Sequence, residues 1–219
     1  MTTERNDIRH HLDDATLTAY SAGSLPEAFG LIVASHVSMC DDCRARLESF
    51  DSIGGALLAT VGSDALAPGA LDRTLALIDA DPTPPPAPPQ RDDAILPAPL
   101  RDYVGGDIDA IRWRSVGMGV RQAVLSTSKS ATARLLYIPA GAAMPDHGHR
   151  GVEMTLVLQG AFEDETDRFA RGDIEIANEA THHTPVADIS ADCICLAVTD
   201  APLRFRGLIP RLAQPFLGI

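Results

Sequence analysis

Residues 141–160 read GAAMPDHGHRGVEMTLVLQG, and this stretch decides the fold of the second half of the chain. Two glycines, two histidines and a glutamate follow the spacing G-x5-H-x-H-x3-E-x6-G: Gly141, His147, His149, Glu153 and Gly160. The histidines are two residues apart, so on an extended strand their side chains point to the same side. The glutamate returns to that side after a short turn. Two imidazoles and a carboxylate accept zinc, iron, manganese or nickel, so we expect a metal site here.

From Tyr103 onward, short apolar runs alternate with glycine and proline, which is typical of an all-β barrel or sandwich. We expect strands at 122–125, 133–138, 153–159, 173–176 and 193–198, and a closing strand with a tail over 204–219. The spacing of the 141–160 stretch resembles the first motif of the cupin proteins without a mismatch. That resemblance implies a jelly-roll-like cupin β-barrel.

A second cupin motif, read from Gly172, is degenerate. Asn178 stands where proline is usual, and Ala180 stands where glycine is usual. The resemblance puts the histidine of this motif at His183 and leaves His182 as a surface neighbour. The expected ligands of the cupin metal are therefore His147, His149, Glu153 and His183. The alternative is a metal-free cupin with a polar pocket.

The first 80 residues predict helices. Apolar residues recur there at three- and four-residue spacing, and Pro26 suits the first turn of a helix. We expect helices over 15–22, 26–39, 41–59 and 70–80, the first of them capped by Asp13 or Asp14. A bundle this small has a limited core, so a structural metal would stabilise it.

A second set of metal ligands lies in this helical part, in the pattern His36-x3-Cys40-x2-Cys43. On a helix these three residues project from one side, with the helix end allowing Cys43 to turn inward. Zinc takes four ligands in a tetrahedron, and the fourth has to come from His10 or His11. A closed site of two histidines and two cysteines is structural, not catalytic. The alternative for a Cys-x-x-Cys pair is a redox dithiol.

Residues 81–100, DPTPPPAPPQRDDAILPAPL, separate the two parts. So many prolines exclude a regular helix or a central strand and favour a semi-extended linker. The fold class is therefore multidomain, α plus all-β. We expect a helical zinc-binding domain over 1–80, a Pro-rich linker over 81–100 and a cupin β-barrel over 101–219.

The formal net charge of −12 is concentrated in the helical part, where residues 1–80 carry twelve acidic and five basic side chains. Such a surface argues against direct binding of nucleic acid and suits a basic partner, although it also serves solubility. No apolar run approaches the length of a membrane span, and the N-terminus has no apolar signal region. We therefore expect a cytoplasmic protein.

Residues 8–46, IRHHLDDATLTAYSAGSLPEAFGLIVASHVSMCDDCRAR, resemble the zinc-binding domain of the ChrR-type anti-sigma factors. The resemblance continues through DYVGGDIDAIRWRSVGMGVRQAVL at 102–125 and covers nearly the whole chain apart from the linker. It implies that His11, rather than His10, joins His36, Cys40 and Cys43. It also implies that the helical domain binds a group IV (extracytoplasmic-function) sigma factor. The cupin domain would sense oxidative stress, for which the signal in relatives is singlet oxygen or an organic hydroperoxide.

Two further sets of residues are candidates within this hypothesis. Apolar side chains of the first and fourth helices are candidate sigma contacts or, alternatively, parts of the core: Leu17, Tyr20, Leu71 and Leu75. Cys193 and Cys195 share a face of a predicted strand, as inert buried thiols or as an oxidant-sensitive pair near the cupin metal.

Two other functions remain open at this point. A cupin dioxygenase or isomerase with a helical appendage could use an iron site of three histidines and a glutamate to activate oxygen. A zinc-storage or scaffold protein is the third possibility. No acid–base pair beyond the ligands is evident in the sequence, and zinc in the cupin, which we expect, would favour the regulator over the enzyme.

Overall fold

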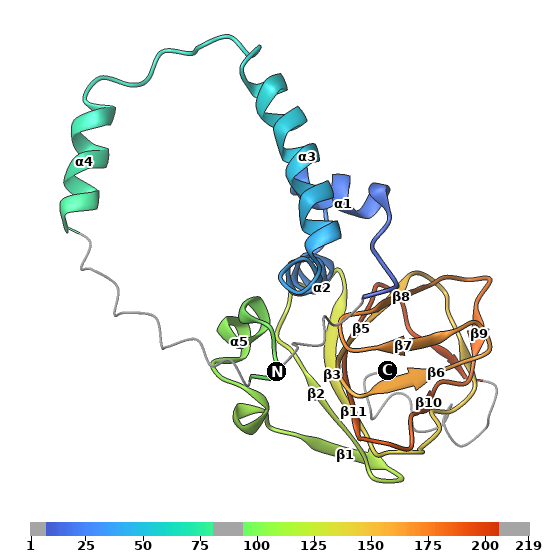
Figure 1. Cartoon of the computed structure of the whole chain (residues 1–219). Coiled ribbons are helices and arrows are strands. Elements are labelled where there is room, and N and C mark those ends of the chain that lie inside the picture. The colour runs from blue at the N-terminus through green and yellow to red at the C-terminus, as the bar shows by residue number, and fades with distance from the viewer. Residues whose placement is uncertain (1–7, 81–93, 206–219) are drawn as a thin grey trace, which may run out of the picture.

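The computed structural model describes residues 8–80 and 94–205, with helices first and strands after them (Figure 1). The helices are α1 (Asp14–Ser21), α2 (Glu27–Val37), α3 (Asp41–Leu58), α4 (Ala70–Ala80), α5 (Ala98–Val104) and the 3-10 turn η1 (Ile108–Ala110). The first six strands are β1 (Arg114–Gly117), β2 (Val120–Val124), β3 (Thr132–Ile138), β4 (His147–Gly148), β5 (Glu153–Gln159) and β6 (Ala161–Glu163). The others are β7 (Arg168–Ala170), β8 (Ile174–Ala177), β9 (His182–His183), β10 (Val186–Ala187), β11 (Cys193–Thr199) and β12 (Arg204–Phe205). The expected division into a helical part and an all-β part is confirmed.

One large antiparallel sheet organises the β part, in the order β1-β2-β3-β11-β5-β8. The central strand β11 pairs with β3 and β5, so that Cys195 lies opposite Leu136 on one side and Val157 on the other. Two three-stranded sheets, β10-β6-β7 and β12-β4-β9, face it and close the barrel. Gly160, the last glycine of the G-x5-H-x-H-x3-E-x6-G motif, lies between β5 and β6 with φ +69°. A Cβ at this position would lie 2.6 Å from the Asp192 carbonyl oxygen.

Both faces of the large sheet are buried, which explains why its central strands are apolar throughout. All seven residues of β11 are buried. Alternate residues, such as Leu156 and Leu196, face the helices, while Val157 and Cys195 face the interior of the barrel. A strand that is covered on both sides shows no polar alternation, because neither row of side chains meets water.

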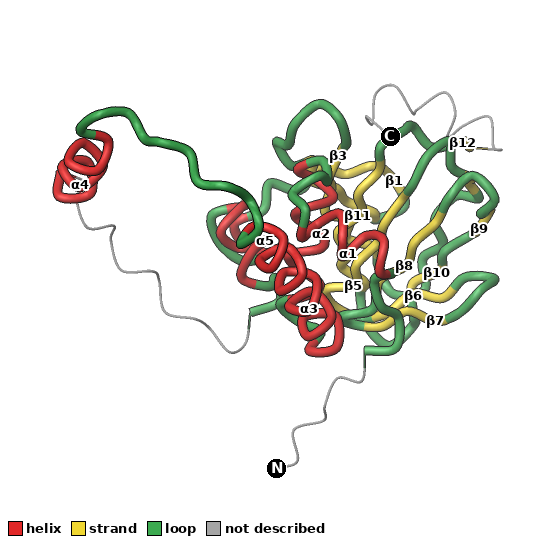
Figure 2. The backbone as a smooth tube through the Cα atoms, turned by 90° about the horizontal axis from the view of Figure 1, so that it is seen from above, coloured by secondary structure: helices red, strands yellow, loops and turns green. Residues whose placement is uncertain are grey.

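Helix α2 covers the outer face of this sheet and is itself covered by α1, α3 and α5 (Figures 1 and 2). Its sequence EAFGLIVASHV is apolar on all sides, as expected for a helix enclosed by protein. Asp13 caps α1 by accepting a hydrogen bond from the Thr16 backbone N–H at 2.7 Å. The helices and the outer face of the sheet share one hydrophobic core, so the helical part is not a separate bundle.

Helix α4 is the one of the four expected helices that does not pack with the others, because it lies far from them (Figures 1 and 2). Every residue of α4 after Ala70 is exposed, including Leu71, Leu75 and Ile78 on one stripe. Its bounds, 70–80, are those expected from the sequence. The periodicity therefore identified the helix correctly, but not where its apolar stripe would be buried.

The predicted linker also needs correction at its C-terminal end. Residues 81–93 lie outside the described residues, but Leu96 and Leu100 are fully buried and α5 begins at Ala98. Pro97 precedes the helix, in a position where a missing backbone N–H costs nothing, so proline starts this helix instead of preventing it.

The five expected strands correspond to β2, β3, β5, β8 and β11 within two residues. The two-residue strands β4, β9 and β10 were not expected, because so short a run carries no periodic signal. The closing strand is β12, and the remainder of 204–219 lies outside the described residues. Among the described residues, none of the helices combines the length and the apolar character needed to span a bilayer.

Candidate metal sites

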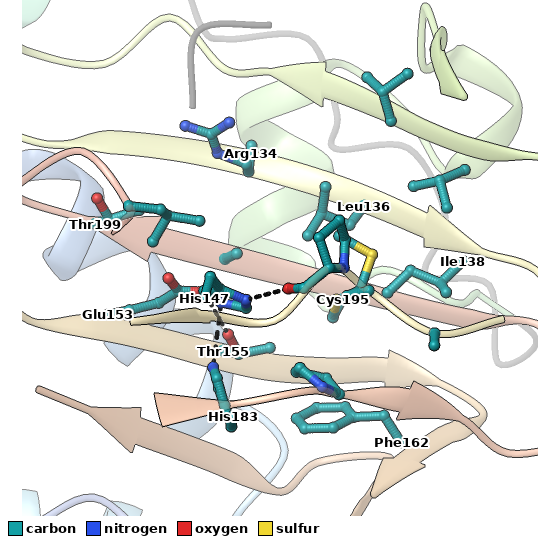
Figure 3. Close-up of a pocket in the computed structure, with 18 of the residues that line it drawn as sticks. Arg134, Leu136, Ile138, His147, Glu153, Thr155, Phe162, His183, Cys195 and Thr199 are labelled. Carbon is teal, nitrogen blue, oxygen red and sulfur yellow. Dashed lines mark hydrogen bonds between the residues drawn. The ribbon is translucent and has the colours of Figure 1, made fainter. Parts of the chain in front are cut away.

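Three histidines meet in the barrel where β4 lies beside β9. The register pairs His147 with His183 and Gly148 with His182, so the first pair faces inward and His182 faces out. His183 Nε2 lies 3.2 Å from His147 Nε2 (Figure 3). It lies 3.3 Å from His149 Nε2. The structure thus brings together the three predicted histidines and leaves His182 on the surface, as expected.

This spacing of nitrogens fits a metal ion. Two nitrogens bound tetrahedrally at about 2.0–2.1 Å from one zinc lie about 3.3 Å apart. Glu153 lies beside the three nitrogens rather than among them, with Oε2 3.3 Å from Nδ1 of His149. Those two atoms are buried, and neither has a partner of good hydrogen-bond geometry among the described residues. The role of Glu153 as a metal ligand stays a prediction.

Two carboxylates that the sequence analysis missed hold His183 in place. Asp164 Oδ2 and Glu175 Oε1 each lie 2.9 Å from Nδ1 of His183 and so direct its Nε2 toward the other histidines. Burial lowers the pKa of His183, but these carboxylates outweigh burial and raise it to about 9. A histidine that binds a metal through one nitrogen commonly donates the other N–H to a carboxylate. The sequence contained one indication of the role of Glu175, because it is a charged residue between two isoleucines of a predicted strand.

His147, His183 and Cys195 line an apolar cavity of about 340 Å³ inside the barrel (Figure 3). Cys193 and Cys195 are both fully buried and face the barrel interior, as their spacing predicted. The neighbouring Cys193 thiol and burial raise the pKa of Cys195 well above its ordinary value. A protonated thiol is a poor nucleophile, so these surroundings favour the inert alternative, and oxidant sensitivity stays a prediction.

The second cluster lies where α2 ends and α3 begins. His36 is in the last turn of α2, Cys40 is the N-cap of α3 and Cys43 is in its first turn, so the three residues do not share one helix. His11 completes the group from the N-terminal segment, with Nδ1 3.3 Å from Cys40 Sγ and 3.7 Å from Cys43 Sγ. Potential ligand atoms of all four residues lie within 4.8 Å of one another.

The donor atoms of this cluster also fit a metal. A sulfur and a nitrogen bound to one zinc lie about 3.6 Å apart. Burial lowers the pKa of His36 to about 4, and both of its ring nitrogens are buried without a hydrogen-bond partner among the described residues. Burial raises the pKa of Cys43 to about 11. A metal would satisfy the orphaned imidazole and displace the thiol proton.

The adjacent histidines 10 and 11 point to different places, which the sequence alone left open. His11 faces the cysteines, whereas His10 faces the cupin half. Its Nε2 lies 3.2 Å from Asp167 Oδ2, and its ring packs 4.4 Å from that of Phe169. The structure therefore places His11 in the cluster, as the family resemblance implied.

The four candidate sigma contacts divide into two groups. Leu17 is fully buried in the shared core, so its assignment as a surface contact is wrong, and Tyr20 is half-buried against the same core. Leu71 and Leu75 are 66% and 49% exposed on α4. Burial of Leu17 follows from the packing of α1 on α3, which its position on a helix face could not reveal.

The fold and its two histidine-containing clusters define a class of protein, a cupin that carries a helical module with a candidate metal site at its N-terminus. Residues 102–202 match the family described as the ChrR cupin-like domain. The chain is 58% identical over 212 residues to a protein of Cereibacter sphaeroides named anti-sigma-E factor ChrR, covering 97% of this chain and 99% of the relative.

A solved structure extends this similarity to the fold. It is described as Rhodobacter sphaeroides SigE in complex with the anti-sigma ChrR, and one of its chains matches this one with a TM-score of 0.78 and 56% identity. The match covers 88% of this chain and 99% of that chain. The chain belongs to the ChrR family.

Proposed function

We propose that this protein is an anti-sigma factor that binds a group IV (extracytoplasmic-function) sigma factor and keeps it from RNA polymerase and promoter DNA. The observation that carries the proposal is the 58% identity, over nearly the full length, to a protein named as an anti-sigma factor. The match to a structure of such a protein in complex with SigE supports it. The chain is then a regulator rather than an enzyme, and it acts in the cytoplasm, where its partner meets RNA polymerase.

The surface that would bind the sigma factor consists of α4 and the C-terminal half of α3. The exposed apolar residues of these two segments are Ile53, Leu57, Leu58, Leu71, Leu75, Leu77 and Ile78. A run of exposed leucine and isoleucine on an otherwise acidic module marks a protein-binding site, because water would otherwise surround it. Acidic residues on the same helices, such as Asp51 and Asp72, suit a basic, DNA-binding partner.

Zinc is the metal we propose for the cluster of His11, His36, Cys40 and Cys43, because two thiolates and two imidazoles are preferred zinc ligands. Zinc there would cross-link the N-terminal segment to the α2–α3 junction. The residues themselves hold the junction in shape: the Cys43 backbone N–H points at Cys40 Sγ, and Arg46 donates to the Leu12 carbonyl at 2.8 Å. The site therefore fixes the base from which α3 extends.

The cupin half is, in this proposal, the sensor of oxidative stress, with a second metal, zinc, held by His147, His149 and His183 together with Glu153. The apolar cavity beside the histidines would admit a small apolar oxidant. Cys193 and Cys195 line the barrel interior close by. A reaction at this site would weaken the binding of the helical part to the sigma factor.

The proposal is tested by transcription in vitro with the purified full chain and a group IV sigma factor from the same organism. The full chain should inhibit transcription from promoters of that sigma factor. A double substitution, Leu71→Ser with Leu75→Ser, should weaken binding about tenfold or more, because buried apolar anchors dominate such interfaces.

The matched control is Ile189→Ser, which removes an apolar side chain that is 88% exposed on the cupin half. It should bind the sigma factor as the wild type does. Failure of the folded full chain to bind or inhibit the sigma factor would refute the proposed function. Equal binding by the α4 double variant would refute the assignment of the surface.

A further inference from the structure

We infer that the turn Arg171–Gly172–Asp173 is the junction through which the cupin histidine site acts on the cluster of His11, His36, Cys40 and Cys43. The turn connects β7 to β8, and two of its residues contact segments outside the barrel strands: Asp173 binds the N-terminal segment and Arg171 binds the end of the linker. The inference rests on the proposed function, in which the cupin half controls the helical half.

Asp173 holds the N-terminal segment. Its carboxylate is 2% exposed and accepts hydrogen bonds through Oδ1 from the backbone N–H groups of Arg9 at 2.7 Å and His10 at 3.0 Å. Oδ2 accepts from the Ala170 N–H at 2.8 Å, and Ile174 donates its N–H to the His10 carbonyl at 3.3 Å. A buried carboxylate is stable only while such donors surround it, so the contact is either fully made or lost.

The segment held in this way leads directly into the metal-binding cluster. His10 is fixed on the cupin half, with its ring against Phe169, and the next residue, His11, lies 3.3 Å from Cys40 Sγ. Any displacement of residues 9–10 therefore moves a member of the cluster, because one peptide unit links the two histidines.

The other two residues of the turn bind β5 and the start of the cupin half. The backbone N–H of Gly172 donates to the Val157 carbonyl of β5 at 2.8 Å. The Arg171 guanidinium donates to the Ile95 carbonyl at 3.0 Å and to the Leu158 carbonyl, and so joins the start of the cupin half to β5. One cupin turn thus holds β5, the start of the cupin half and the residues that directly precede His11.

The same turn leads in the other direction to the cupin histidines. Glu175 follows Asp173 by two residues, and its carboxylate lies 2.9 Å from Nδ1 of His183. Glu175 faces the cavity from β8, and Asp173 stands at the head of that strand. A change at His183 therefore reaches the N-terminal segment through the Glu175 carboxylate, the backbone of β8 and the part-buried hydrogen bonds of Asp173.

The test measures whether the two sites communicate through Asp173. Four full-length, zinc-loaded proteins are compared: the wild type, His183→Ala, Asp173→Asn and the double variant. The rate at which iodoacetamide alkylates Cys40 and Cys43 is read peptide by peptide by mass spectrometry, so the buried cysteines 193 and 195 do not confuse it. His183→Ala should change that rate about fivefold or more when Asp173 is present, and less than about twofold in the Asp173→Asn background.

A second variant and a matched control complete the design. His10→Ala removes only a ring at the edge of the junction and should reduce the coupling even if Asp173→Asn folds poorly. Asp109→Asn, an exposed carboxylate elsewhere on the cupin half, should leave it intact. The inference is overturned if His183→Ala leaves the alkylation rate of the wild type unchanged, or changes it equally in all backgrounds.

Inhibition of the sigma factor by the same proteins separates this inference from the proposed function. If the effect of His183→Ala on the alkylation rate depends on Asp173 but the sigma factor is not inhibited, the proposed function is refuted and the inference about the junction is not. Inhibition without coupled alkylation would refute the junction alone.

Discussion

Single buried polar groups determine what each site can do. The two ring nitrogens of His36 are costly to bury without a partner, and the three converging Nε2 atoms of the cupin histidines have one another as neighbours at 3.2–3.3 Å. Each set therefore points to a metal ion. Asp164 and Glu175 show the complementary role, because they fix which nitrogen of His183 faces the cavity.

At this scale we predict that Glu175→Gln lowers the metal affinity of the cupin site about tenfold, because the His183 N–H loses a charged acceptor. Competition with a chromogenic chelator measures the affinity. Glu179→Gln, which alters an exposed residue just beyond β8, is the control and should not change it. An unchanged affinity in Glu175→Gln would show that the carboxylate does not support the metal.

A second prediction concerns the pH dependence of the metal-free protein. Burial lowers the pKa of His36 from 6.5 to about 4, so the folded state keeps this histidine neutral where the unfolded chain takes up a proton. The contribution of His36 to the free energy of unfolding should therefore be full above pH 6.5 and fall by up to about 3 kcal/mol as the pH drops to about 4. Urea titrations at several pH values measure it, and His36→Gln should remove most of the slope. A slope that is the same in both proteins would contradict the prediction.

Leu17 provides the third residue-scale prediction. Because this side chain is fully buried in the core shared by helices and sheet, Leu17→Ala should lower the free energy of unfolding by about 2–5 kcal/mol. Leu71→Ala, on the exposed stripe of α4, should change it by no more than about 0.5 kcal/mol. Denaturant unfolding distinguishes the two, and equal losses would mean that Leu71 also packs in a core.

The helices differ in what holds them in place. Helix α2 is enclosed by the sheet, α1, α3 and α5, whereas α4 has no buried residue. An isolated eleven-residue helix is marginal in water, since few residues share the cost of nucleation. Helix α4 therefore needs a partner to be firmly held.

We accordingly expect hydrogen exchange to distinguish α4 from α2. Amides of α4 should exchange rapidly in the free protein and become protected when the sigma factor binds, while those of α2 should stay protected in both states. Mass spectrometry of the free protein and of the complex measures both. Protection of α4 in the free protein would show that it already packs against this chain.

The sequence divides into two parts, but in the whole molecule the helices and the outer face of the sheet share one hydrophobic core. Leu135, Leu156 and Leu196 on the outer face of the sheet pack in the same cluster as Leu17 and Ile32 of the helices. The cupin half therefore contributes to the stability of the helical half. The Arg171–Gly172–Asp173 turn lies at the boundary of the two parts, where Asp173 binds the residues that precede His11.

At this scale we predict that a fragment of residues 94–219 exposes the apolar outer face of its sheet. It should bind the dye ANS and associate, because a contiguous apolar face of this size is unstable in water. The full chain should do neither. Fluorescence and sedimentation measure both properties, and a monomeric fragment that does not bind ANS would indicate that the two halves are independent.

The sequence by itself determined the classes of secondary structure, the bounds of α4 and β5, and the two sets of histidines and cysteines. Each of these depends on spacing within about twenty residues, where helix or strand geometry sets which side chains share a face. The separation of His10 from His11, the burial of Leu17 and the carboxylates behind His183 were decided only by the tertiary structure. Each of these needs residues from separate elements to meet, as His10 meets Asp173 across 163 positions, and no local periodicity carries that information.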